Sequence, residues 1–218
     1  MKTIKIIALI AMLLGTQFSM AQKVMSEGTI VYNIVIQTNN KEPQMADALD
    51  GATSTVYLKG ALSRTTMVSA LGTESTIHNS QTGNAVILKE YSGQKLLITL
   101  TKENWVAKNK KYEGMEFKIT DEKTTIAGYN CLKATAQLKD GTSFLVYYTP
   151  DINVSNKEYD QTFKNLPGLA LQYEYESGDI KFKYTVSKID MSPLSSNLFE
   201  FPKSGYRTMT YEESQNKK

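Results

Sequence analysis

Apolar and polar residues alternate along most of the chain with a period of two, which is typical of strands. The pattern is clearest in residues 28–38, where Ile30, Tyr32, Ile34 and Ile36 fall on one face. The runs that follow are rich in Val, Ile, Thr, Tyr and Phe. Glycine-containing turn signals separate them at residues 59–60, 82–83, 92–93, 140–141 and 177–178. Many short strands with such turns predict an all-β, mainly antiparallel domain.

The hairpin predicted around residues 177–178 has one apolar and one polar face. A two-residue loop formed by Ser177 and Gly178 sets its register. The predicted opposite pairs are Tyr175 with Ile180, Glu174 with Lys181, and Tyr173 with Phe182. Apolar residues then meet apolar ones and an acid meets a base, so the pattern specifies the register well.

Two other predicted hairpins are apolar on both faces. Around residues 92–93, Glu90 lies opposite Lys95, and residues 86–88 face residues 96–98. Consecutive apolar residues in a strand point to opposite faces, so both faces of this hairpin need cover. Around residues 140–141, a two-residue loop predicts that Leu138, Ala136 and Ala134 share a face with Leu145 and Tyr147, opposite Phe144, Val146 and Tyr148.

A sheet that is apolar on both sides can be covered by a second sheet, by helices or by an apolar ligand. Helix signals are few. Ser155 and Glu158 have capping-box spacing and predict a short helix towards Lys164, and Thr101 can cap a turn through Trp105. A third, weakly amphipathic helix is expected at residues 42–49. Short helices covering one face of a curved sheet fit this pattern.

The first 21 residues have the pattern of a signal peptide. Lys2 and Lys5 precede an apolar run at residues 6–14, and Ser19 and Ala21 supply small side chains for cleavage after Ala21. The run is shorter than the about 20 residues that span a bilayer. No cysteine lies immediately after the cleavage site, where a lipid-anchored bacterial protein would carry one. We therefore expect a periplasmic or secreted protein with no transmembrane segment in the mature chain, comprising a single domain at residues 22–210 and a polar tail at residues 211–218.

Charge and residue counts argue against several kinds of function. The formal net charge is +3, and loss of the two signal-peptide lysines leaves +1, so we expect no nucleic-acid partner. Cys131 is the only cysteine and lies in a strand pattern, which predicts a small buried residue and no internal disulfide. His78 is the only histidine, which argues against the usual zinc sites.

Motifs for catalysis or for nucleotide and calcium binding are missing from the sequence. We expect no cofactor, no metal and no enzymatic activity. A hydrolase that uses scattered carboxylates is a third-ranked hypothesis, because it needs two or more acids to converge in one pocket.

Several phrases late in the chain resemble known families. Residues 123–134, 146–152 and 165–171 are similar, in order, to segments of exported Gram-negative proteins of the GLPGLI type and to related families of unknown function. Asn165 stands where the GLPGLI phrase has its first glycine. Residues 198–206 are similar to the ending common among relatives of the lipoprotein carrier LolA.

The resemblance implies a large curved antiparallel sheet, or open half-barrel of LolA-like type, with a few short helices in its mouth. LolA-like and LppX-like proteins hold lipid acyl chains on the concave face. The leading hypothesis is therefore a soluble periplasmic binding or carrier protein for a hydrophobic ligand, either a lipid or a lipoprotein acyl chain. The candidate ligand-binding residues are Ile87, Leu97, Tyr147, Tyr173, Phe182 and Tyr184.

The alternative hypothesis is a cell-envelope protein–protein interaction module without a small ligand. It would act through a sheet edge or through the residues around Trp105. An exposed apolar patch would favour it over an internal cavity.

Overall fold

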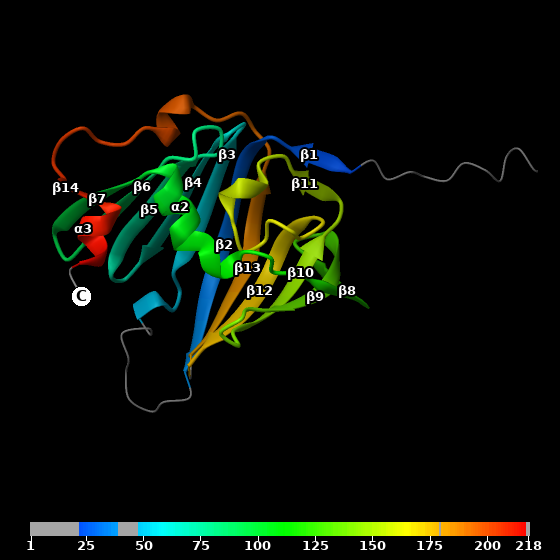
Figure 1. Ribbon diagram of the computed structural model, residues 1–218. Coiled ribbons are helices and arrows are strands. Elements are labelled where there is room, and N and C mark those ends of the chain that lie inside the picture. The colour runs from blue at the N-terminus through cyan, green and yellow to red at the C-terminus, as the bar shows by residue number, and fades with distance from the viewer. Residues whose placement is uncertain (1–21, 39–47, 179, 217–218) are drawn as a thin grey trace, which may run out of the picture.

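The computed structural model describes residues 22–38, 48–178 and 180–216. Twelve strands of these residues form one large sheet that curves around a few short helices and is not closed (Figure 1). The predicted fold class, a mainly antiparallel open half-barrel with few short helices, is confirmed.

The strands of the large sheet are β2 (Glu27–Thr38), β3 (Thr53–Lys59), β4 (Leu62–Ser69), β5 (Gly72–Asn79), β6 (Ala85–Tyr91), β7 (Gln94–Leu100), β8 (Lys118–Ile126), β9 (Tyr129–Gln137), β10 (Ser143–Thr149), β12 (Leu169–Ser177), β13 (Ile180–Asp190) and β14 (Arg207–Thr210). A separate parallel pair consists of β1 (Lys23–Met25) and β11 (Ile152–Val154). The helices are α2 (Lys102–Asn109) and α3 (Tyr211–Gln215), and the 3₁₀ turns are η2 (Lys110–Tyr112), η3 (Lys157–Tyr159) and η4 (Ser196–Phe199).

The sheet consists of two meanders joined side by side. Its strand order is β14-β7-β6-β5-β4-β3-β2-β13-β12-β10-β9-β8. Neighbouring strands are antiparallel except β14, which pairs with β7 in parallel. The pairing of β2 with β13 joins the two meanders, and β14 and β8 are the two edges.

The hairpin of β6 and β7 has the register predicted for it. Glu90 pairs with Lys95, and their side chains form an ion pair of 3.1 Å. Ile87 lies opposite Ile98 on one face, and residues 88 and 97 pair on the other. Both faces are buried, as the sequence predicted.

The hairpin of β12 and β13 keeps its predicted faces but not its predicted pairs. Tyr175 lies opposite Phe182 and Tyr173 lies opposite Tyr184, a shift of two residues from the expected register. Because side chains alternate with period two, a shift of two leaves every side chain on its expected face. Glu174 contacts two lysines on β13, at 2.8 Å from Lys181 and 3.2 Å from Lys183.

The prediction for the hairpin of β9 and β10 was wrong by one residue. Leu138 donates its amide to the carbonyl of Thr142, so the loop is longer than a two-residue turn. Ala136 consequently pairs with Phe144, and residues 134 and 146 pair on the same face. A one-residue slip moves side chains to the other face, so this hairpin has one apolar face and not two.

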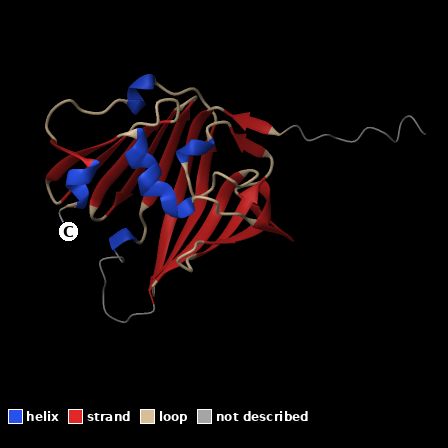
Figure 2. Ribbon diagram, viewed as in Figure 1, coloured by secondary structure: helices blue, strands red, loops and turns tan. Residues whose placement is uncertain are grey.

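Helices and turns cover the concave face of the sheet (Figure 2). Trp105 of α2 is buried over β6 and β7, and Phe163 and Leu166 are buried over β10 and β12. The predicted cap is present, because the Thr101 side chain accepts the Asn104 amide. The helix expected from Ser155 towards Lys164 was wrong, since this segment contains the single 3₁₀ turn η3.

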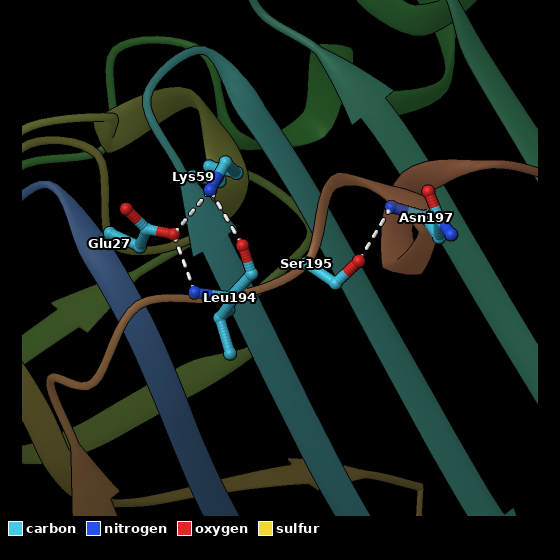
Figure 3. A network of polar contacts seen from close by, with 5 residues as sticks. All are labelled: Glu27, Lys59, Leu194, Ser195 and Asn197. Carbon is cyan, nitrogen blue, oxygen red and sulfur yellow. Dashed lines mark hydrogen bonds and ion pairs between the residues drawn. The ribbon is translucent and has the colours of Figure 1, made fainter.

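A long segment, residues 191–206, covers the convex face of β3 to β7. Phe199 packs there against Ile77, Val86, Leu88 and Leu97. Glu27 holds the start of this segment on the sheet. Its Oε1 accepts hydrogen bonds from the Leu194 amide and from the Lys59 ammonium, each at 2.6 Å (Figure 3). Lys59 also donates to the Leu194 carbonyl at 2.6 Å.

Two further sequence expectations concern the ends of the described ranges. Residues 42–47 of the third expected helix lie outside the described residues, and Leu49 lies in a short 3₁₀ turn. Residues 211–215, expected as part of a polar tail, form helix α3, where Tyr211 packs against the cluster around Trp105.

Candidate binding cavity on the concave face

Strand register decides which candidate residues share a face, because directly paired residues point to the same side. Tyr173 pairs with Tyr184, and Tyr184 pairs with Ile34. Phe182 lies two residues from Tyr184 on the same strand. Pairings carried through β3, β4 and β5 place Ile87 on this side as well. Four of the six candidates therefore lie on the concave face.

The other two candidates lie on the convex face. Leu97 pairs with Leu88 and packs under Phe199. Tyr147 pairs with Lys133, and its hydroxyl donates to Glu122 Oε1 at 2.8 Å. These two side chains therefore point away from the concave face, although Tyr147 packs against the same core cluster as Tyr173 and Tyr184.

A cavity of about 230 Å³ lies between the sheet and the segments that cover it. Phe144, Tyr173, Tyr175 and Tyr184 line it from the sheet. The remaining lining residues come from the covering segments and the β9–β10 loop, and they are Lys111, Tyr112, Leu138, Thr142, Asp160, Thr162 and Phe163. The cavity thus combines an aromatic sheet surface with a few polar groups.

The aromatic rings on the sheet surface stack in pairs across β12 and β13. Tyr173 and Tyr184 have centroids 4.5 Å apart and planes 10° apart, and Tyr175 and Phe182 have values of 4.8 Å and 9°. Side chains on a sheet stand roughly perpendicular to it. Stacked rings therefore turn their faces to one another and their edges and hydroxyls away from the sheet.

The hydroxyls of this stack are neutral hydrogen-bonding groups. Burial raises the pKa of Tyr173 well above the usual tyrosine value, and it also raises the pKa of Tyr175 and of Tyr184. Phe163 closes over the stack, with its ring 4.7 Å from that of Tyr173 in an edge-on arrangement. The cavity wall therefore offers hydroxyl donors and acceptors but no phenolate charge.

Asp160 is the one carboxylate among the residues that line this cavity. It follows η3, and its Oδ1 accepts the Thr162 amide at 2.9 Å. Burial raises the pKa of Asp160, although hydrogen bonds from Thr162 and Phe163 favour its charged form. None of the ion pairs between described residues includes Asp160.

Two neighbouring cavities share walls with this one. A cavity of about 770 Å³ also contacts Phe144 and Tyr175, and one of about 280 Å³ also contacts Tyr112. All three border residues 110–115. This segment is held in place by Met115, which is buried and whose carbonyl accepts the Asn165 side-chain amide at 2.8 Å.

Ile87 occupies a different part of the concave face, under helix α2. It packs with Ile98 and Trp105 in a closed cluster. Beside it, the His78 ring stacks on Trp105 with centroids 4.3 Å apart. Burial lowers the pKa of His78, although Glu158 opposes this. Neither His78 ring nitrogen has a hydrogen-bond partner among the described residues. Ile87 therefore contributes to core packing and does not line the aromatic cavity.

Other expected features can be placed within the described residues. Cys131 is 1% exposed, as predicted, and burial raises the pKa of its thiol. No group of three His, Cys, Asp or Glu side chains in the described part of the chain could hold a metal ion. None of the helices described is long and apolar enough to cross a membrane.

Sequence reasoning missed several residues of the cavity. Alternation placed Tyr175 on the same face as Tyr173, but Tyr175 was not among the candidate ligand-binding residues. Asp160, Thr162 and Phe163 lie in the irregular segment that was expected to be helical. No residue pattern indicated that this segment folds over the aromatic stack.

No protein-family model matches the chain, and no curated protein matches it in sequence. Its fold is similar to several solved structures. An uncharacterized conserved protein from Thermus thermophilus has a TM-score of 0.53 at 8% identity, over 85% of this chain and 91% of that chain. PNGF-II has a TM-score of 0.51 at 14% identity, over 88% of this chain. The matched part covers 33% of PNGF-II, so the chain spans about a third of that protein.

A third structure is the Mycobacterium tuberculosis lipoprotein LppX, with a TM-score of 0.40 at 10% identity, over 77% of this chain and 88% of that chain. That likeness is too distant to carry an argument. At these identities the comparisons establish the fold alone.

Proposed function

We propose that this protein is an exported, periplasmic binding or carrier protein that holds the hydrophobic part of a ligand on the concave face of its sheet and catalyses no reaction. The aromatic cavity bordered by Tyr173, Tyr175 and Tyr184 is the observation that supports the proposal. Ligand sites occur preferentially in such concave positions, including the mouths of β-barrels.

The size of the cavity bears on the kind of ligand. Its volume of about 230 Å³ lies below the about 300–1,000 Å³ typical of small-molecule sites. A longer ligand would extend into the adjoining cavities along residues 110–115. The finer form of the proposal is a lipid or lipoprotein acyl chain, held by a member of an exported family of GLPGLI or related type.

Native mass spectrometry tests the proposal most directly. The mature protein is purified from periplasm without detergent, and its denatured mass supplies the reference. We expect excess mass that disappears on solvent extraction and matches a lipid. A clean apo mass, together with no mass gain when lipids are added, would count against a carrier.

A variant that blocks the cavity tests whether the ligand binds there. Thr142 lines the cavity from the β9–β10 loop, so Thr142→Trp should fill part of it. We expect this change to weaken binding of the uncharged fluorescent probe N-phenyl-1-naphthylamine at least tenfold, about 1.4 kcal/mol. Tyr147→Trp on the convex face is the matched control and should leave the affinity unchanged.

One observation favours the alternative of a protein-interaction module. A groove of about 520 Å³ on the convex side is lined by Phe199, Phe201 and the neighbouring residues of β6 and β7, and Phe201 is 44% exposed. Under this alternative the purified protein carries no ligand, and the unmodified protein does not bind the fluorescent probe. Phe201→Ser should abolish capture of an envelope partner.

A further inference from the structure

We propose that the ligand of the aromatic cavity carries an ammonium group, and that this cationic head binds the Asp160 carboxylate while the apolar part lies against the tyrosine stack. The inference rests on the proposed function and names the chemical class of its ligand. An amine-headed amphiphile has both parts.

The first argument is the position of the carboxylate. Asp160 lines the cavity at the end of η3, opposite Tyr173 and Tyr184 of the sheet. Its hydrogen-bond donors are neutral groups of Thr162 and Phe163, which follow it in the chain. These donors satisfy part of the hydrogen-bonding capacity of the carboxylate and orient it. They leave the carboxyl group without a cationic partner among the described residues.

The second argument is energetic. Ionising a carboxyl group in a low-dielectric site is costly when no opposite charge is near, and burial accordingly raises the pKa of the partly buried Asp160. No lysine or arginine among the described residues forms an ion pair with Asp160. The surrounding tyrosine hydroxyls are neutral. A ligand ammonium would favour the ionised form of Asp160 and form charge-assisted hydrogen bonds with it, which are stronger than neutral ones.

An anionic head group fits the same cavity less well. It would lie near Asp160, and its only cationic partner in the lining would be Lys111. Lys111 is exposed, and its ammonium lies 4.9 Å from the centroid of the Tyr112 ring. Like charges in the interior would then repel, while the favourable contact would be at the solvent-exposed rim.

The test compares three probes with one tail and three heads, namely octylammonium, octanol and octanoate. Binding to the mature full-length protein is measured by isothermal titration calorimetry near neutral pH. We expect octylammonium to bind about tenfold or more tightly than octanol, and octanoate to bind most weakly. Equal or tighter binding of octanoate would overturn the inference while leaving the proposed carrier function intact.

Variants assign the preference to Asp160. We expect Asp160→Asn to reduce octylammonium to the affinity of octanol, and Asp160→Glu to retain part of the preference. Glu122→Gln, on the convex face, is the matched acid-to-amide control and should change nothing. A preference for octylammonium that survives Asp160→Asn would also refute the assignment. Failure of all three probes and of N-phenyl-1-naphthylamine would instead contradict the carrier function itself.

Discussion

Tyrosine residues serve two different purposes in this sheet, and single substitutions should separate them. Tyr32 is 4% exposed, and its hydroxyl donates to the Ala170 carbonyl at 2.8 Å. Tyr147 lies on the convex face and donates to the exposed Glu122. We expect Tyr32→Phe to lower the free energy of unfolding by about 1–3 kcal/mol, because the buried carbonyl loses its donor. Tyr147→Phe should change it by no more than about 0.5 kcal/mol. Urea denaturation measures both, and equal losses would contradict this reasoning.

His78 should make stability depend on pH near neutrality. Burial lowers its pKa in the folded protein, so the unfolded chain binds more protons as the pH falls. The stabilisation is complete above the unfolded pKa of about 6.5 and is lost progressively as the pH falls from there towards the lower folded value. Each unit of lowering corresponds to about 1.4 kcal/mol. As the only histidine, His78 gives one assignable NMR titration.

The His78→Phe variant is the control for that dependence. It keeps an aromatic ring against Trp105 and removes the titrating group. The dependence of stability on pH between about pH 7 and 5.5 should then be weaker than in the unmodified protein, and what remains belongs to other groups such as Asp160, whose pKa burial raises. An NMR titration that gives His78 a pKa of 6.5 or higher would refute the argument.

At this scale the sequence predicted which side chains share a face within the β12–β13 hairpin, but not which face of the β6–β7 hairpin points to the concave side. Alternation correctly grouped Tyr173 with Tyr175 and Tyr184. It could not decide whether Leu97 or its neighbour Ile98 points inward, since both are apolar. Asp160 escaped notice because an isolated acid in an irregular segment has no periodicity to mark it.

Among the elements, the segment at residues 191–206 depends on a small polar anchor. The Glu27 carboxylate holds both Lys59 of β3 and the Leu194 amide (Figure 3). We expect Glu27→Gln to speed hydrogen exchange of the Leu194 amide and of its neighbours, with little change in exchange at β12. Ser195→Ala, which removes only the cap of η4, should leave the Leu194 amide protected. Unchanged exchange in Glu27→Gln would show that apolar packing of Phe199 alone holds the segment.

The same anchor has a predictable response to acid. The hydrogen bond from Lys59, followed by that from Leu194, lowers the pKa of Glu27 below its usual value of 4.5. The stabilisation is therefore present above about pH 4.5, and it is lost as the pH falls through the lower folded value. Glu27→Gln should not show this part of the acid response.

Loop length decided how well the hairpins could be predicted. The β6–β7 hairpin was correct because its turn has the assumed length and Glu90 meets Lys95. The register of the β12–β13 hairpin differs from the predicted one by two residues, so every side chain still lies on its predicted face. The β9–β10 hairpin slipped by one, which exchanged the faces of Leu145 and Phe144. Composition marks the position of a turn, but backbone hydrogen bonds such as that from Leu138 to Thr142 set its length.

For the molecule as a whole, export remains a prediction, because residues 1–21 lie outside the described residues. We expect periplasmic material to have the mass of residues 22–218. Ala21→Trp should leave the chain unprocessed, since signal peptidase requires a small residue at that position. Cleavage after Ala21 would leave Gln22 as the N-terminus, next to Lys23, whose amide donates to the Asp151 carbonyl at 2.8 Å. An intact Met1 on periplasmic protein would refute cleavage.

The junction of the two meanders has a consequence for how the chain folds. Most strands pair with a neighbour in the sequence, whereas β2 pairs with the distant strand β13. Ile34 can therefore pair with Tyr184 only when nearly the whole chain is available. Closing so long a loop costs entropy before any contact compensates for it, which slows folding. We therefore expect the two meanders to form first as separate units, each with an open strand edge. We expect the pairing of β2 with β13 to be the slow step, and until it occurs these open edges should be the sites most prone to intermolecular pairing.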